Sequence, residues 1–286
     1  MIVVGFLFPQ GHTLSDLIRP ILMLMLLFTF VQLDLSRSSL QKNHFFILLA
    51  NIIIPLGWFY VIPADYGLLK SAILVICMAP TAVASPVLAG FMNRRTDFVA
   101  MSVILTSIPI ALLMPFQLKQ MGMVSTASSP FNILWSILTL VMAPFIVSRL
   151  IRHYLPRVKA WFVQYNQLNF LLFLINVYLA AAKSAHAFHE QGEAGMQFLP
   201  GLALGIVLAG SVNFAVGYLI GRKAFGLEGS LSLGRKNTMF AMWVALTFMD
   251  PITALGPMAY IVYQNTVNSI QIFWTKQQDL KVRASR

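Results

Sequence analysis

The sequence predicts an all-α polytopic membrane protein with about ten transmembrane helices, the first of them short, in two inverted five-helix repeats. Three observations support this prediction. The composition is 58% hydrophobic with only 10% charged residues, which lies outside the range of soluble globular domains. The chain divides into apolar segments of about 20 residues, the length that crosses a bilayer as a helix. Basic residues are unevenly distributed between alternate connections, which is typical of membrane topology.

The expected spans are separated by short polar or basic connections. In chain order they cover residues 1–10, 17–33, 45–62, 68–91, 98–116, 131–151, 162–182, 198–220, 229–250 and 258–274. Residues 1–10 are half the length of a full span. A basic, solvated tail follows, residues 276–286.

The ninth span contains polar residues where a lipid-embedded helix should be apolar. Residues 229–243 read GSLSLGRKNTMFAMW and place Arg235, Lys236 and Asn237 in mid-segment. An ionisable residue at the centre of a spanning helix costs roughly 2.5–3.5 kcal/mol on insertion scales. Unwound backbone at this depth is tolerated where it lines a cavity. We therefore expect a broken helix that places a cation and an amide at a substrate site.

The fourth span is expected to be broken as well. Residues 78–90 read MAPTAVASPVLAG, and each of the two prolines removes a backbone hydrogen bond and crowds the preceding turn. In the next span, Ser102 and Thr106 lie one turn apart on one face. The expected helix-break positions in the two interrupted spans are Pro80, Pro86, Gly229 and Gly234.

Charge predicts the orientation. Fourteen of the 20 lysines and arginines fall in the tail and in the connections after the second, fourth, sixth and eighth spans, against four in the other connections. Because basic residues stay inside, the C-terminus is expected in the cytoplasm of a multi-pass inner or plasma membrane protein. The alternative places Arg235 and Lys236 in a cytoplasmic loop, with residues 239–263 as one span. That alternative would move the basic tail outside.

The two halves of the chain share a pattern. Each ends with an interrupted span followed by a span with polar residues on one face, as in residues 258–274 with Gln264, Asn265 and Asn268. An odd number of spans in each half puts the two copies in opposite orientation. Interrupted segments at matching positions of two halves indicate a secondary transporter with its site near the bilayer midplane.

These segments resemble the bile acid:sodium symporter family, in a divergent, prokaryotic-type form. The run PTAVASPVLAG followed by AMSVILTS is similar to the family's fourth and fifth helices, which read like CPGGTASN and ALSVxxT. GRKNTMFAMW followed by PITALGPMAYIVYQN is similar to its ninth and tenth helices. The likeness covers nearly the whole chain, and it depends on order and spacing rather than on one motif.

The resemblance implies a division into two domains. The core would comprise residues 44–117 and 198–275, with the broken fourth and ninth helices crossing in it, and the panel residues 1–43 and 118–197. Members of the family move organic anions inward with sodium. By position, Ser85, Ser102 and Thr106 correspond to suppliers of sodium oxygens, and Asn237 and Asn265 to residues of the substrate cavity.

Departures from the family pattern put sodium coupling in doubt. The family's asparagine on the fourth helix corresponds to Pro86, and its glutamate and glutamine on the ninth correspond to Ser232 and Lys236. A sodium site needs several hard oxygens and usually negative charge, but no carboxylate falls in mid-span. We therefore expect the ammonium of Lys236 to take the place of the metal ion.

The expected site of the ammonium is defined by a helix end and by hydroxyls. It would meet the C-terminal end of a half-helix and the side chains of Ser85, Ser102 and Thr106. Burial disfavours the charged form of a lysine, so proton coupling through Lys236 is a further expectation. The half-helix N-termini at Pro86 and at Asn237 and Thr238 would offer N–H groups to an anionic substrate.

The sequence thus predicts a secondary active transporter of small organic anions that works by alternating access. Sodium coupling through backbone and hydroxyl oxygens is one alternative, and a passive channel or an integral-membrane enzyme is another. The predicted protein is not an enzyme. Its expected partners are an organic anion and the lipid bilayer, with no nucleic acid, and its expected coupling ion, if any, is sodium or a proton, with no other cofactor.

Overall fold

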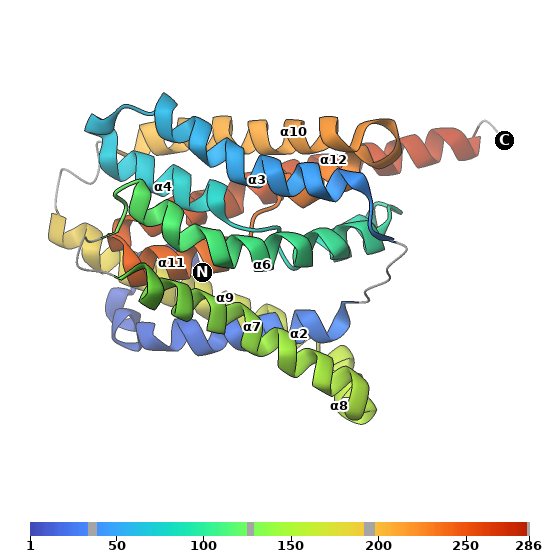
Figure 1. The fold of residues 1–286 in the computed structure, drawn as a ribbon, viewed down its shortest axis with the longest axis horizontal. Helices are drawn as coiled ribbons and strands as arrows, with labels where there is room; N and C mark the ends of the chain where they lie inside the picture. The colour runs from blue at the N-terminus through green and yellow to red at the C-terminus, as the bar shows by residue number, and fades with distance from the viewer. Residues whose placement is uncertain (34–38, 125–128, 192–197, 285–286) are drawn as a thin grey trace.

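The computed structural model describes residues 1–33, 39–124, 129–191 and 198–284. Within these ranges the regular elements are helices (Figure 1). The α-helices are α1 Ile2–Leu7, α2 Ile18–Gln32, α3 Lys42–Val61, α4 Gly67–Met78, α5 Ser85–Phe91, α6 Thr96–Gln120, α7 Pro130–Tyr154, α8 Pro156–Gln164, α9 Gln167–Gln191, α10 Leu199–Gly234, α11 Thr238–Phe248 and α12 Leu255–Ala284. The 3₁₀ helices are η1 Pro9–Leu17, η3 Ala64–Tyr66 and η5 Pro251–Ala254.

The helical content and the apolar helices confirm an all-α membrane protein. Among the described residues, six helical segments are long and apolar enough to cross a bilayer: Pro9–Gln32, Lys42–Val61, Thr96–Gln120, Pro130–Tyr154, Gln167–Glu190 and Leu199–Gly234. The two interrupted spans do not reach this length as single helices, because each is divided into shorter pieces. The ten-helix inverted repeat stays a prediction.

The seventh expected span is shifted along the chain and ends at Gln191 rather than at residue 182. The span expected from residue 162 begins at Gln167, because the basic connection before it is itself a helix, α8. Pro156 stands in the first turn of α8, where proline fits without loss of a helical hydrogen bond. Phe162 of α8 packs edge-on against Phe28 of α2, with ring centroids 4.6 Å apart, which holds this short helix to the long ones. The basic tail expected from residue 276 is helical, since α12 extends as far as Ala284, and its first residues are exposed, as expected of a solvated tail.

The long helix α10 is a hairpin rather than a straight rod. The backbone leaves helical geometry at Arg222 (φ 51°, ψ −144°) and Phe225 (φ −138°, ψ 31°), and Figure 1 shows the orange ribbon turning back there. The two arms approach closely at Gly217 and Gly229, where a Cβ added to Gly229 would lie 2.2 Å from the Gly217 carbonyl oxygen. The expectation that Gly229 breaks the helix is therefore wrong. This glycine lets two helical arms touch through their backbones.

The helices form two groups in Figure 1. One contains α3, α4, α10 and α12, and the other contains α2, α7 and α9, with α6 and α11 between them. We call the first the core group and the second the panel group. We count α5, α6 and α11 with the core group, because they follow core helices along the chain. The division into two moving domains stays a prediction.

Polar contacts join the two groups around α11. Arg19 of α2 lies over the Trp243 ring, 5.9 Å from its centroid. Lys183 Nζ donates to the Leu246 carbonyl in the last turn of α11 at 3.3 Å. The panel group therefore holds both the face and the C-terminal end of this half-helix.

At the other end of the molecule, hydrogen bonds join helices within one group. Gln32 of α2 donates to Asn166, between α8 and α9, at 2.8 Å. In the core group, the Arg95 backbone N–H donates to Glu228 of the second α10 arm at 3.1 Å. Each of these two bonds thus stabilises one group internally.

Candidate functional site

The two interrupted segments cross and pair through their backbones. The first runs between Met78 of α4 and Ser85 of α5, and the second between Gly234 of α10 and Thr238 of α11. Thr81 and Lys236 form an isolated antiparallel bridge. This pairing satisfies backbone groups that the broken helices leave free at a depth where water is scarce.

Two further backbone bonds flank the bridge. Ala82 N–H donates to the Arg235 carbonyl at 2.9 Å, and Asn237 N–H donates to the Pro80 carbonyl at 2.8 Å. Pro80 has no N–H group, so no backbone donor is left without a partner at this position. The breaks expected at Pro80 and Gly234 therefore lie at the crossing, whereas Pro86 stands in the first turn of α5.

The helix that leaves the crossing is capped by its own asparagine. Asn237 is the N-cap of α11, and its side-chain oxygen accepts from Phe240 N–H at 3.1 Å. Asn237 and Thr238 are both buried. The Asn237 side-chain oxygen therefore caps the helix and is not free for a ligand. The groups that this terminus can offer an anion are its remaining backbone N–H groups.

Lys236 lies at the centre of the crossing and is fully buried, with 0% of its surface exposed. Its ammonium donates to the side-chain oxygen of Asn51 and to the Cys77 carbonyl, the latter at 2.9 Å. Cys77 is in the last turn of α4, where unpaired carbonyls carry partial negative charge. The alternative with Lys236 in a cytoplasmic loop is therefore wrong.

Asn51 is a residue that the sequence analysis did not assign to the site. It comes from α3, is buried, and its amide nitrogen lies 3.3 Å from the Ala79 carbonyl just beyond the end of α4. The side chain thus binds both the ammonium and the helix end that receives it. The available signal was a lone amide inside the apolar run LLANIII.

The hydroxyls expected around the ammonium bond elsewhere. Ser102 Oγ donates to the Phe98 carbonyl of its own helix at 3.3 Å. Thr106 Oγ1 accepts from Thr81 N–H at 3.0 Å and lies 2.8 Å from the Ser102 carbonyl. Thr106 thus supports the bridge residue Thr81 from α6, whereas Ser102 bonds only within its own helix. The expectation that these hydroxyls contact Lys236 is wrong, because the helix end and Asn51 supply its partners.

Two buried hydroxyls at the crossing have no hydrogen-bond partner among the described residues. They are Ser85 Oγ, at the start of α5, and Ser232 Oγ, in the last turns of α10. The Ser232 carbonyl accepts from Thr81 Oγ1 at 2.5 Å, so this serine lies beside the bridge. Each oxygen remains free to bind a water molecule or a cation.

Helix α12 meets the crossing through residues other than the one expected. Gln264 Oε1 accepts from Lys236 N–H at 3.2 Å, and Tyr260 Oη donates to the Gly234 carbonyl at 2.7 Å. Asn265 is exposed and makes none of these contacts. Residues 260 and 264 share one helix face, whereas residue 265 is turned by about 100° from its neighbour.

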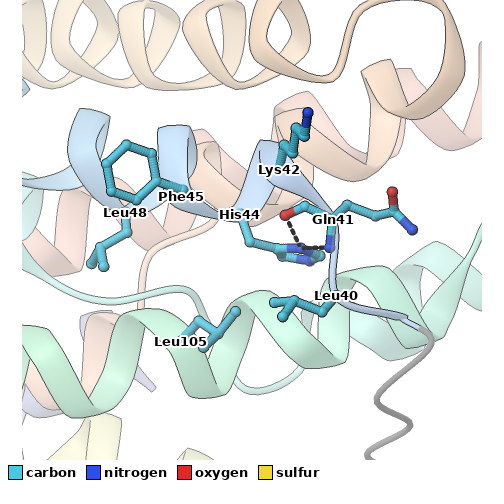
Figure 2. Close-up of a pocket in the computed structure, with 7 residues that line it drawn as sticks. All are labelled: Leu40, Gln41, Lys42, His44, Phe45, Leu48 and Leu105. Carbon is cyan, nitrogen blue, oxygen red and sulfur yellow. Dashed lines mark hydrogen bonds between the residues drawn. The ribbon is translucent and has the colours of Figure 1, made fainter.

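The pocket in Figure 2 lies at the start of α3, away from the crossing. It has a volume of about 440 Å³ and is bounded by Leu40, His44 and Leu105, among others. His44 Nδ1 accepts from Gln41 N–H at 2.9 Å, so Nε2 carries the proton and donates to the Phe98 carbonyl at 2.9 Å. Both ring nitrogens are occupied by backbone, which makes His44 a structural residue.

No protein-family model matches the chain, and no curated protein is significantly similar to it.

Proposed function

We propose that the protein is a secondary transporter of small organic anions, working by alternating access, in which the ammonium of Lys236 replaces a bound metal ion. The observation that carries the proposal is the buried Lys236 at the crossing of two broken helices. Broken helices that meet inside a membrane protein are a recurring device of secondary transporters, because their free ends bind ions and substrates.

The charge at the crossing favours an anionic ligand. Within the described ranges no carboxylate contacts Lys236; its partners are an amide oxygen and a carbonyl. A buried ammonium without a carboxylate leaves net positive charge in a medium that stabilises it poorly. The N-terminus of α11 adds partial positive charge one residue away. An organic anion near the crossing would offset both.

The packing supports alternating access. The panel group contacts α11 through Trp243 and Leu246. If the basic connections are cytoplasmic, α11 lies in the outer half of the membrane and this contact closes the outer side. Transport would then require the panel group to separate from α11 and to close on the core at the opposite end.

The sodium-coupled alternative is favoured by one observation. Ser85 Oγ and Ser232 Oγ are buried at the crossing without hydrogen-bond partners in the described part of the chain, and hydroxyl oxygens are ligands that a hard cation accepts. Both ligands would be neutral hydroxyls, so these two residues would bring no negative charge to a sodium ion. We therefore keep sodium coupling as the second candidate.

Purified protein tests the proposal in two steps. A thermal-shift screen against organic anions, in sodium or potassium and at several pH values, identifies a ligand. Uptake of that anion into liposomes is then compared between the wild type and Lys236→Gln. The matched control is Lys70→Gln, which removes a lysine from α4 whose ammonium lies over the Phe59 ring, 4.0 Å from its centroid.

We expect uptake that does not require sodium and that changes its pH response in Lys236→Gln but not in Lys70→Gln. Uptake that requires sodium in the wild type would favour the second candidate. Failure of every anion to stabilise the protein or to enter liposomes would contradict the proposed substrate class.

A further inference from the structure

A groove on the membrane face of the core group is separate from the crossing. It lies between α3 and the first arm of α10 and has a volume of about 570 Å³. Its walls are mainly apolar; they include Phe46, Leu49 and Ile53 of α3 and Val216, Leu219 and Ile220 of α10. Both helices are candidate membrane spans, so these walls face the hydrocarbon region. Such a groove suits an acyl chain.

One end of the groove is basic. Lys42, the first residue of α3, and Arg222, at the turn of the α10 hairpin, are exposed and line it together. In the part of the chain that the structure describes, neither side chain forms an ion pair with a carboxylate, and no acidic residue lines the groove. Asn43 Nδ2 donates to the Ile220 carbonyl at 2.5 Å and fixes the two helices at this end.

Figure 2 shows how Lys42 is directed. Its side chain extends away from Leu40 and Leu105, which bound the smaller pocket on the other side of α3. The smaller pocket has Lys42 as its only cation among its lining residues, whereas the α3–α10 groove has two. The larger groove is therefore the better match for an anionic group with an apolar chain.

The backbone at Arg222 gives an independent reason to assign the side chain a role. Its φ of 51° lies in the left-handed region, which glycine adopts freely and arginine adopts at a cost in free energy. Strained residues of this kind occur preferentially where a ligand or a functional contact requires the side chain. The arginine is thus held at the mouth of the groove in a conformation that does not favour it.

We propose that the α3–α10 groove binds an anionic phospholipid, with its phosphate between Lys42 and Arg222 and an acyl chain along the apolar walls. Basic pockets between transmembrane helices at the cytoplasmic side are a known form of lipid headgroup site. The groove opens at the same end as Arg95, in one of the basic connections that the charge distribution assigns to the cytoplasm. The proposal requires a membrane protein but not a transporter.

Native mass spectrometry of detergent-purified protein tests the site with equimolar dioleoyl phosphatidylglycerol and dioleoyl phosphatidylcholine. We expect preferential retention of one phosphatidylglycerol. Each removed basic residue should lower the preference about fivefold, as near-surface lysines and arginines do. The variants are Lys42→Gln, Arg222→Gln and the double variant, and the matched control is Lys223→Gln. Lys223 is exposed beside Arg222 but does not line the groove.

Two additional variants separate the contribution of the basic charges from that of the strained backbone and from that of the apolar walls. Arg222→Gly relieves the strained φ, so it should keep or raise the melting temperature while it lowers lipid preference. Ala50→Phe fills the groove wall and leaves both cations in place; it should reduce retention of the whole lipid. These results would distinguish a lipid site from a general loss of folding.

Several outcomes would overturn the proposal. They are equal retention of the two lipids by the wild type, an equal effect of Lys223→Gln and Arg222→Gln, and unchanged retention in Ala50→Phe. Displacement of the lipid by millimolar inorganic phosphate would show that the cations bind a free anion and that the apolar groove contributes nothing.

Discussion

The ammonium of Lys236 donates a hydrogen bond to the side-chain oxygen of Asn51, a residue 185 positions earlier in the chain. This bond joins α3 to the segment between α10 and α11, and a second bond from the same ammonium reaches the end of α4. Three parts of the core group are therefore held by one buried cation. Its removal should affect stability as well as function.

Asn51→Leu is expected to destabilise the protein, because the size of the side chain is kept while the ammonium loses a buried partner. Hydrogen bonds to charged groups are worth about 1.5–3 kcal/mol, and we expect a loss of that order. Thermal unfolding in detergent measures it. The double variant Asn51→Leu with Lys236→Met should lose less than the sum of the single variants, because the two side chains form one contact. Strict additivity would contradict a direct interaction.

Lys236→Gln combined with Ser232→Glu should create a sodium response. The change removes the ammonium and places a carboxylate in the last turns of α10, at a position that lies next to the bridge between the two interrupted segments. We expect sodium, but not potassium, to raise the melting temperature of the double variant. The single variant Ser232→Glu serves as control, since Lys236 should then neutralise the new carboxylate. An equal response to both ions would argue against a shared cation position.

Gly229→Leu should prevent the α10 hairpin from closing. Even a Cβ at this position would lie 2.2 Å from the Gly217 carbonyl oxygen, so the two arms must separate. We expect loss of folded protein, measured as monodisperse yield in size-exclusion chromatography. The control is Gly57→Ala in α3, where a Cβ meets nothing within 4 Å. Alanine there should be neutral or stabilising by about 0.5–1 kcal/mol. Normal yield of Gly229→Leu would mean that the arms do not touch.

Membrane topology can be tested with reporter fusions. If ten spans cross the bilayer, a green fluorescent protein fused at the C-terminus should fluoresce in the cytoplasm. Alkaline phosphatase inserted at Gly122, in the turn after α6, should be active because the turn lies outside. Insertion of the same reporter after Asn93, before α6, should give an inactive enzyme. The reverse pattern would invert the orientation inferred from charge.

The sequence by itself determined the class of protein, because composition and hydrophobic length report directly on the bilayer. Of the four expected break positions, Pro80 and Gly234 lie at the crossing, whereas Pro86 and Gly229 lie inside helices. The sequence also identified Lys236 as the unusual residue, since a lysine inside an apolar span is costly wherever its side chain points. These conclusions need no knowledge of which helices are neighbours.

Only the tertiary structure decided which groups meet Lys236. Asn51 lies on α3, and spacing along the chain carries no information about a contact between α3 and the segment that joins α10 to α11. For the same reason, the sequence pointed to Asn265 although Gln264 contacts the crossing. Consecutive residues on a helix point about 100° apart, and the packing of α12 decides which of them faces the site. Gly229 likewise serves a backbone contact with Gly217, which exists only once the two arms of α10 have folded together.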